Sequence, residues 1–114
     1  MQHLNLFSFF HLNLMFSSIE ENQRIEVINK CYWPILNLAS EYKIPIGVEA
    51  TGLTLELISE LDKSWIDELK TLIELGLCEF IGSGYSQISA PIVPYEINLH
   101  NQIIGKRIYK KILN

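Results

Sequence analysis

Short apolar runs alternate with helical patterns along this chain of 114 residues, and this alternation limits its fold more than any other feature. Three runs have the length of buried strands: residues 4–12, the segment IPIGVEATG at 44–52 and the segment LCEFIG at 77–82. Helical patterns fill the chain between them and follow the last one. Strands that alternate with helices join by right-handed crossovers into a parallel sheet with helices outside. The sequence therefore predicts an α/β fold with three parallel strands.

The first strand is expected to lie in the centre of this sheet. Residues 4–12 form a near-continuous apolar and aromatic run. Such runs are typical of strands that are covered on both faces.

The segment after the first strand predicts an amphipathic helix. Ser17 and Ser18 are candidate N-caps. Pro34 lies inside the helical pattern and predicts a kink near Trp33 or two abutting helices, because proline removes a backbone donor and clashes with the preceding turn. The apolar stripe consists of Ile25, Ile28, Cys31, Tyr32, Ile35, Leu36 and Ala39.

Three further helices are expected. The first covers about 54–61, and the second begins at about 62–63 with Ser64 as its cap and Gly76 at its C-terminal end. The third begins near Pro94, since proline suits the first turn of a helix. Its apolar residues are Ile97, Ile104, Ile108 and Ile112.

Polar residues follow each of the three predicted strands. The first strand ends in His11 and Asn13, the second in Glu49 and Thr51, and the third in the segment 82–87, GSGYSQ. In parallel α/β folds, ligands bind at the C-terminal ends of the strands, where loops vary without disturbing the core. The sequence therefore predicts a single binding site to which all three strand ends contribute.

Each of these residues also has a purely structural interpretation. A histidine within an apolar strand, such as His11, is commonly a hydrogen-bonded core residue. Glu49 follows a buried strand and must be paired or hydrated, so a site role and a structural ion pair are both open. Tyr85 could belong to the core or present its ring and hydroxyl to a sugar. The glycines before Tyr85 could have no other role than to form a tight turn.

No cofactor or metal is expected. The glycine spacing in GSGYSQ fits neither the Walker pattern nor the dinucleotide-binding pattern, and no lysine accompanies it. The three histidines, His3, His11 and His100, lack the spacing of metal ligands.

Charge argues against binding to nucleic acid or to a membrane surface. Thirteen acidic and nine basic residues give a net charge of -4. The basic segment KRIYKK at 106–111 is interpreted as a solvated helix end favoured by the helix dipole.

Residues 1–16 contain no Lys or Arg and are interrupted by polar residues, so they predict neither a signal peptide nor a membrane span. Cys31 and Cys78 are expected to be small buried residues, and a cytoplasmic location is expected.

Four segments together resemble a known enzyme family. FHLNLMFSS, CYWPILNLA, IPIGVEATG and CEFIGSGYSQ, in this order, resemble the N-terminal part of glycoside hydrolase family 57, the α-amylase and 4-α-glucanotransferase group. In that family His11 would match the opening histidine motif, with Asn13 in place of a proline. Tyr85 falls on an aromatic position, and Gln87 lies close to a position that is often Glu.

The resemblance implies that residues 1–114 are the N-terminal portion of an incomplete (β/α)7 barrel. It implies substrate-binding roles for His11, Asn13, Glu49, Tyr85 and Gln87, with an α-glucan or another oligosaccharide as the substrate. Retaining glycosidases need two carboxylates about 5–5.5 Å apart. In the family both follow the matched region, so no catalytic residue is expected here.

Length leads to the same expectation. A (β/α) barrel of eight strands requires about 250 residues, so we expect a truncated, inactive piece of a carbohydrate-active domain. Its uncovered sheet edge would favour self-association. Two alternatives stay open: a stand-alone binding module whose edge is covered by a second copy, and a metal-dependent polysaccharide deacetylase-like enzyme, although that chemistry needs an Asp-rich metal motif.

Overall fold

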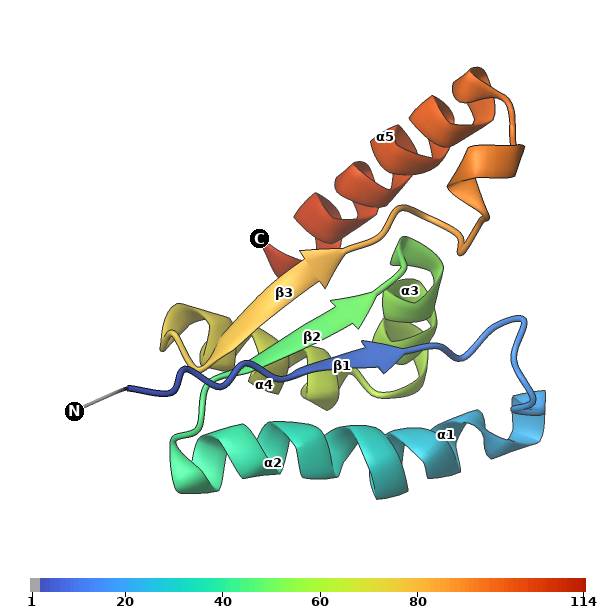
Figure 1. Cartoon of the computed structure of the whole chain (residues 1–114). Coiled ribbons are helices and arrows are strands. Elements are labelled where there is room, and N and C mark those ends of the chain that lie inside the picture. Colours follow the sequence, from blue (N-terminus) through green and yellow to red (C-terminus); the bar gives the residue numbers. More distant parts are fainter. Residues whose placement is uncertain (1–2) are drawn as a thin grey trace.

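The computed structural model describes residues 3–114, which form a parallel sheet with helices packed beside it (Figure 1). The strands are β1 (Phe9–Leu12), β2 (Ile46–Ala50) and β3 (Cys78–Gly82), in the order β1-β2-β3. Both pairings are parallel. The predicted α/β class with three parallel strands is confirmed, and the open sheet agrees with an incomplete barrel.

The first strand differs from its prediction in length and position. It begins at Phe9 rather than at residue 4, and it lies at the edge of the sheet with β2 in the centre. Leu4, Leu6 and Phe7 are about nine-tenths exposed. The prediction of a central, doubly covered strand is therefore wrong, because among residues 3–114 β1 has a neighbouring strand on one side only.

The first helical stretch is continuous but changes its winding. It consists of η1 (Glu21–Gln23), α1 (Arg24–Val27), the π-helical segment η2 (Ile28–Tyr32) and α2 (Trp33–Tyr42). The π-helical turn lies directly before Pro34, whose missing N–H and bulky ring disfavour an ordinary α-helical turn at this point. The predicted irregularity near Trp33 is thus a widened turn inside a continuous stretch, which does not divide into two abutting helices.

Two helix caps differ from the predicted ones. Glu20 and Gln23 form a capping box at the start of the first stretch, in place of the two serines before them. At the second site Asp62, rather than Ser64, accepts the backbone N–H of Trp65 at 3.2 Å. In both cases an acidic residue at the actual helix start occupies the position from which a side chain reaches the free N–H groups.

The remaining helices lie at or near their predicted places. They are α3 (Gly52–Leu61), α4 (Lys63–Glu74), the short η3 (Ala90–Ile92) and α5 (Tyr95–Leu113). Gly76 adopts a left-handed φ of 70° just after α4, which confirms the predicted C-terminal glycine. No helix within residues 3–114 is both long and apolar enough to cross a bilayer.

The hydrophobic core lies between the helices and one face of the sheet. Cys78 is buried in it as predicted, but Cys31 is exposed and that prediction is wrong, since Cys31 falls beside the buried stripe of the first helical stretch. The buried apolar residues are Leu12, Leu14, Ile28, Tyr32, Leu36, Ala39, Ile46, Val48, Ala50, Leu55, Ile58, Trp65, Ile66, Leu69, Leu72 and Cys78.

The opposite face of the sheet is open to solvent. Side chains alternate between faces along a strand, so this face carries Phe9 and His11 from β1, Glu49 from β2, and Glu79 and Ile81 from β3. In the register of the sheet, His11 lies beside Glu49 and Glu49 beside Ile81. Phe9 is 67% exposed and Ile81 39%.

Candidate functional site

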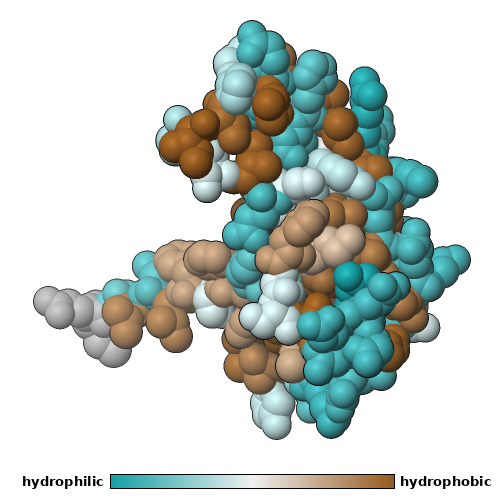
Figure 2. Space-filling model, turned by 90° about the vertical axis from the view of Figure 1, so that its right-hand side faces the viewer, coloured by the Kyte–Doolittle hydropathy of each residue, from teal (hydrophilic) through white to brown (hydrophobic). Residues whose placement is uncertain are grey.

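A hollow of about 420 Å³ lies at the C-terminal ends of the strands. Figure 2 views the molecule from the side toward which the strands point, and it shows an indentation between the upper part, which carries α5, and the body below. The hollow is lined by Phe9, His11, Glu49, Ser83, Gln87 and Ile88. Three of the five predicted site residues, His11, Glu49 and Gln87, are therefore together, as expected where parallel strands end at one edge.

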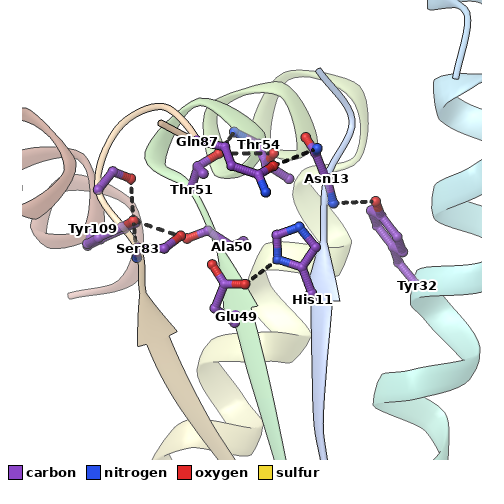
Figure 3. Close-up of polar contacts among 11 residues, drawn as sticks. His11, Asn13, Tyr32, Glu49, Ala50, Thr51, Thr54, Ser83, Gln87 and Tyr109 are labelled. Carbon is purple, nitrogen blue, oxygen red and sulfur yellow. Dashed lines mark hydrogen bonds and ion pairs between the residues drawn. The ribbon is translucent and has the colours of Figure 1, made fainter. Parts of the chain in front are cut away.

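His11 and Glu49 form the central pair of the hollow. They are neighbours in the β1–β2 register, and the Nδ1 atom of His11 contacts the Oε2 atom of Glu49 (Figure 3). The histidine side chain is 42% exposed, whereas that of Glu49 is only 14% exposed. The carboxylate of Glu49 is thus paired, as one interpretation of the sequence expected, and it also lines the hollow. Its role in a site stays a prediction.

Glu49 also carries a buried oxygen without a partner. Its Oε1 atom has no hydrogen-bond partner among residues 3–114, and the same is true of the Oγ atom of Ser83. Burying polar atoms without hydrogen bonds is costly. Glu49 and Ser83, two residues that line the hollow, thus each carry a buried polar atom without a hydrogen-bond partner within residues 3–114.

Asn13 lies behind Gln87 and supports it. The Nδ2 amide of Asn13 donates to the Oε1 atom of Gln87 at 3.1 Å (Figure 3). The Oδ1 atom of Asn13 accepts the backbone N–H of Met15 at 3.2 Å. Asn13 is not among the residues that line the hollow. Its direct contact with a sugar stays a prediction, but the bond to Gln87 joins the loop after β1 to the segment after β3.

Tyr32 holds the loop after β1 through a hydrogen bond to its backbone. Its hydroxyl accepts the backbone N–H of Asn13 at 3.1 Å. The side chain is only 6% exposed, and burial raises the pKa of Tyr32 to about 12. The sequence pattern placed Tyr32 in the apolar stripe alone, because a helical stripe does not reveal where the hydroxyl of a tyrosine will reach.

Tyr85 is placed differently from the other predicted site residues. A Cβ atom on Gly52 would lie 3.2 Å from the Cδ2 atom of Tyr85, which shows that the ring lies against the start of α3. Burial and the neighbouring Glu56 raise the pKa of Tyr85. Tyr85 does not line the hollow, so the structure does not bring it together with His11 and Glu49, and its contact with a sugar stays a prediction.

Sequence reasoning missed three residues of the hollow: Phe9, Ser83 and Ile88. Phe9 lies two positions before His11, and strand alternation alone places both on one face. Ser83 was grouped with its neighbouring glycines as part of a turn. No signal in the sequence distinguishes Ile88 from an ordinary loop residue.

The hollow combines an aromatic ring with several hydrogen-bonding groups. Such a combination suits a polyhydroxylated ligand, because a sugar ring has apolar faces and an edge of hydroxyl groups. Among the six lining residues Glu49 is the only acid, whereas a two-carboxylate glycosidase mechanism needs a second. Within residues 3–114 no cluster of three or more His, Cys, Asp or Glu side chains could hold a metal ion.

The sequence and the fold are both similar to those of known proteins. Residues 3–114 match the family model described as glycosyl hydrolase family 57. An α-amylase of Pyrococcus furiosus is 26% identical over 88 residues, which cover 76% of this chain and 14% of the relative. An α-amylase of Pyrococcus abyssi is 28% identical over 88 residues, which cover 76% of this chain and 13% of the relative. This chain thus spans about a seventh of the length of these relatives.

A solved structure shares the fold. The crystal structure of a 4-α-glucanotransferase from Thermococcus litoralis matches with a TM-score of 0.77 and 24% sequence identity. The match covers 93% of this chain and 17% of that chain.

Proposed function

Because this chain belongs to glycosyl hydrolase family 57 and is therefore related to carbohydrate-active enzymes, we propose that its hollow is part of the substrate-binding site of an α-glucan hydrolase or transglycosylase. The amylase and glucanotransferase relatives support this substrate class. The observation that carries the proposal is the pair of unpartnered buried atoms, Glu49 Oε1 and Ser83 Oγ, beside the exposed ring of Phe9.

In this proposal the ligand contacts are divided among the three strands. The Phe9 ring packs on the apolar face of a sugar, and Glu49 and Ser83 bond its hydroxyl groups. His11 binds Glu49 through Nδ1, which leaves Nε2 for the ligand. Gln87 accepts from Asn13 through Oε1, which leaves its amide group to donate.

We further propose that the chain is the N-terminal portion of a (β/α)7 barrel whose catalytic carboxylates lie outside residues 1–114. Its match to 13–17% of the length of its relatives supports this, and so does the open face of the sheet. Glu49, the only acid of the hollow, is already paired with His11. The chain alone should therefore neither hydrolyse maltoheptaose nor transfer glucosyl units from it. Turnover that Glu49→Gln abolishes would contradict this.

The binding claim is tested with maltoheptaose and two matched variants in a calorimetric titration. Glu49→Gln removes the charge in the hollow, whereas Glu74→Gln changes an exposed residue at the end of α4, next to the opposite ends of the strands. The first change should weaken binding about tenfold or more, as expected for loss of a bond to a charged group, and the second should leave it unchanged. Equal affinities of the two variants would rule out Glu49 as a ligand contact.

We also propose that the outer strands favour association with a second copy of the chain. Within residues 3–114, β1 and β3 each have one edge without a neighbouring strand. Unpaired edges with exposed apolar residues beside them, here Phe7, Phe9 and Ile81, promote pairing between chains.

A further inference from the structure

One face of α5 carries polar and small residues where an apolar stripe would be usual. Asn101, Gly105 and Tyr109 are spaced four residues apart and so lie on one side of the helix. Asn101 and Gly105 are the buried residues of α5, and Tyr109 is half-buried. This face meets residues 82–86, the glycine turn that follows β3.

Asn101 bonds the backbone of this turn three times. Its Oδ1 atom accepts the N–H of Ser86 at 2.8 Å, and its Nδ2 donates to the carbonyl of Ser86 at 3.0 Å. Its own backbone carbonyl accepts the N–H of Tyr85 at 3.0 Å. A buried amide is costly without partners, so these bonds explain why an asparagine can occupy the inner side of the helix.

Gly105 lets the helix and the turn touch backbone to backbone. A Cβ atom at this position would lie 2.5 Å from the carbonyl carbon of Gly84 and 2.7 Å from the nitrogen of Tyr85. Gly84 itself has a φ of 93°, which side chains disfavour. Both glycines are therefore needed for the same backbone contact between α5 and the turn. A larger residue at position 105 would prevent this contact.

Tyr109 joins the turn to the end of β2. Its hydroxyl accepts the N–H of Ser83 at 3.0 Å and lies within donating distance of the carbonyls of Ala50, at 3.0 Å, and Gly84 (Figure 3). Burial raises the pKa of Tyr109, so the hydroxyl keeps the proton that it donates. A Cβ on Gly82 would lie 2.5 Å from the ring of Tyr109, so the ring sits directly on the end of β3.

The start of α3 holds the turn from another side. The N–H groups of Gly52 and Leu53 donate to the carbonyls of Gly84 and Tyr85, at 2.8 and 2.9 Å. The backbone of the turn is thus bonded by two helices. The side chain of Ser83 and the following Gln87 face the hollow.

We propose that the α5 face formed by Asn101, Gly105 and Tyr109 is a positioning device for the binding site: it holds the glycine turn so that Ser83 and Gln87 face the hollow. None of the three lines the hollow, so they act through the turn. The proposal rests on the proposed function for its ligand, but the placement of the turn is tested without one.

The first test is hydrogen exchange of backbone amides in the 114-residue chain. In the wild-type chain the amides of Ser83, Tyr85 and Ser86, which donate to α5, should exchange far more slowly than in an unstructured peptide. Rapid exchange of all three would overturn the proposal before any substitution is made.

The second test compares two tyrosine variants of the same helix. Tyr109→Phe keeps the ring and removes the hydroxyl, whereas Tyr95→Phe removes an exposed hydroxyl at the start of α5. In Tyr109→Phe the Ser83 amide should exchange about tenfold faster, while the Val48 amide in the core keeps its rate. Tyr95→Phe should change neither rate. If the exchange of the Val48 amide became faster by the same factor, the variant would be destabilised as a whole, and the proposal would be overturned.

The third test is the affinity for maltoheptaose. Folded Tyr109→Phe should bind it about fivefold or more weakly than the wild-type chain, because Ser83 and Gln87 are no longer held in place. Unchanged affinity would overturn the positioning role. If the wild-type chain does not bind maltoheptaose, the proposed function fails, and the exchange rates of Ser83 and Val48 alone decide whether α5 positions the turn.

Discussion

At the residue scale, a single hydroxyl, that of Tyr32, connects the core to the hollow. It accepts the Asn13 N–H, and Asn13 in turn bonds Gln87. Tyr32 also packs at a tilt against Trp65, with ring centroids 6.2 Å apart. The position of the loop after β1 thus depends on a side chain that is otherwise part of the core.

Burial of Tyr32 predicts a loss of stability in alkaline solution. Its pKa is raised from 10.0 to about 12 in the folded chain. Below the unfolded pKa the phenol is neutral in both states and adds no pH dependence. Above it the unfolded chain loses the proton first, so the free energy of unfolding falls by up to about 1.4 kcal/mol per pH unit until the folded pKa is reached.

Urea denaturation below and above the ordinary tyrosine pKa, at about pH 9 and about pH 11, checks this loss. Tyr32→Phe should lose about 1 kcal/mol less over this interval, because phenylalanine has no proton to release. Tyr42→Phe, which changes an exposed tyrosine, should behave like the wild-type chain. The same alkaline loss in all three proteins would exclude Tyr32 as its source.

At this scale the sequence predicted three of the residues that line the hollow and missed Phe9, Ser83 and Ile88. His11 and Glu49 were foreseen because parallel strands bring their ends to one edge, and their register makes them neighbours. Tyr85 was assigned to the hollow because it follows a glycine turn. Gly84, which precedes Tyr85, has a left-handed φ that directs the chain toward α3. The sequence around Gly84 does not reveal this direction.

At the scale of elements, Asp62 joins two helices with one carboxylate. Its Oδ1 accepts the N–H of Trp65 at the start of α4, and its Oδ2 accepts the indole N–H of Trp33 in α2 at 2.7 Å. Asp62→Ala removes a helix cap and leaves the Trp33 donor without this acceptor. We expect a loss of about 2–3 kcal/mol in the free energy of unfolding.

The control for Asp62 is Asp67→Ala, an exposed change inside α4 that should alter stability by less than about 0.5 kcal/mol. Asp62→Asn, which keeps an oxygen acceptor, should lie between the two. Urea denaturation of the three variants measures the differences. An Asp62→Ala chain as stable as Asp67→Ala would show that the carboxylate contributes nothing to this junction.

Helix α5 shows why the elements were easier to predict than their faces. Its start at Pro94 was predicted closely, because proline and the following pattern mark a helix start. The four isoleucines that the sequence analysis named as its apolar residues are not its buried residues, and Ile97 and Ile104 are 52% and 40% exposed. The inner side instead has Asn101 and Gly105, because this part of the helix packs against a backbone turn, and only its last turns, with Tyr109, Ile112 and Leu113, pack against the core.

At the scale of the whole molecule, the sheet is covered on one face and open on the other. The sequence predicted the order of elements and the parallel sheet, since alternating periodicities determine both. It predicted the wrong central strand, since β2 and not β1 lies in the middle. Strand order depends on contacts between segments that are distant in the sequence. The apolar pattern of residues 4–12 does not distinguish an edge strand from a central one.

The open edges predict self-association that depends on concentration. Sedimentation velocity of the wild-type chain should show a rising average mass as concentration increases. Ile81→Lys places a charge on the open face of β3 and should weaken association about tenfold. Ile92→Lys changes a residue that is 83% exposed in η3, away from the strand edges, and should have no such effect. A wild-type chain that stays monomeric throughout would contradict the proposal.

The central claim is that three parallel strands bring their ends to one carbohydrate-binding hollow. The most direct test is a titration of the isotope-labelled chain with maltoheptaose, followed by amide chemical shifts in NMR spectra. We expect the amides of His11, Glu49, Ser83 and Gln87 to shift together, while that of Lys43, just before β2, does not move. Shifts that are absent, or that gather away from the three strand ends, would contradict the claim.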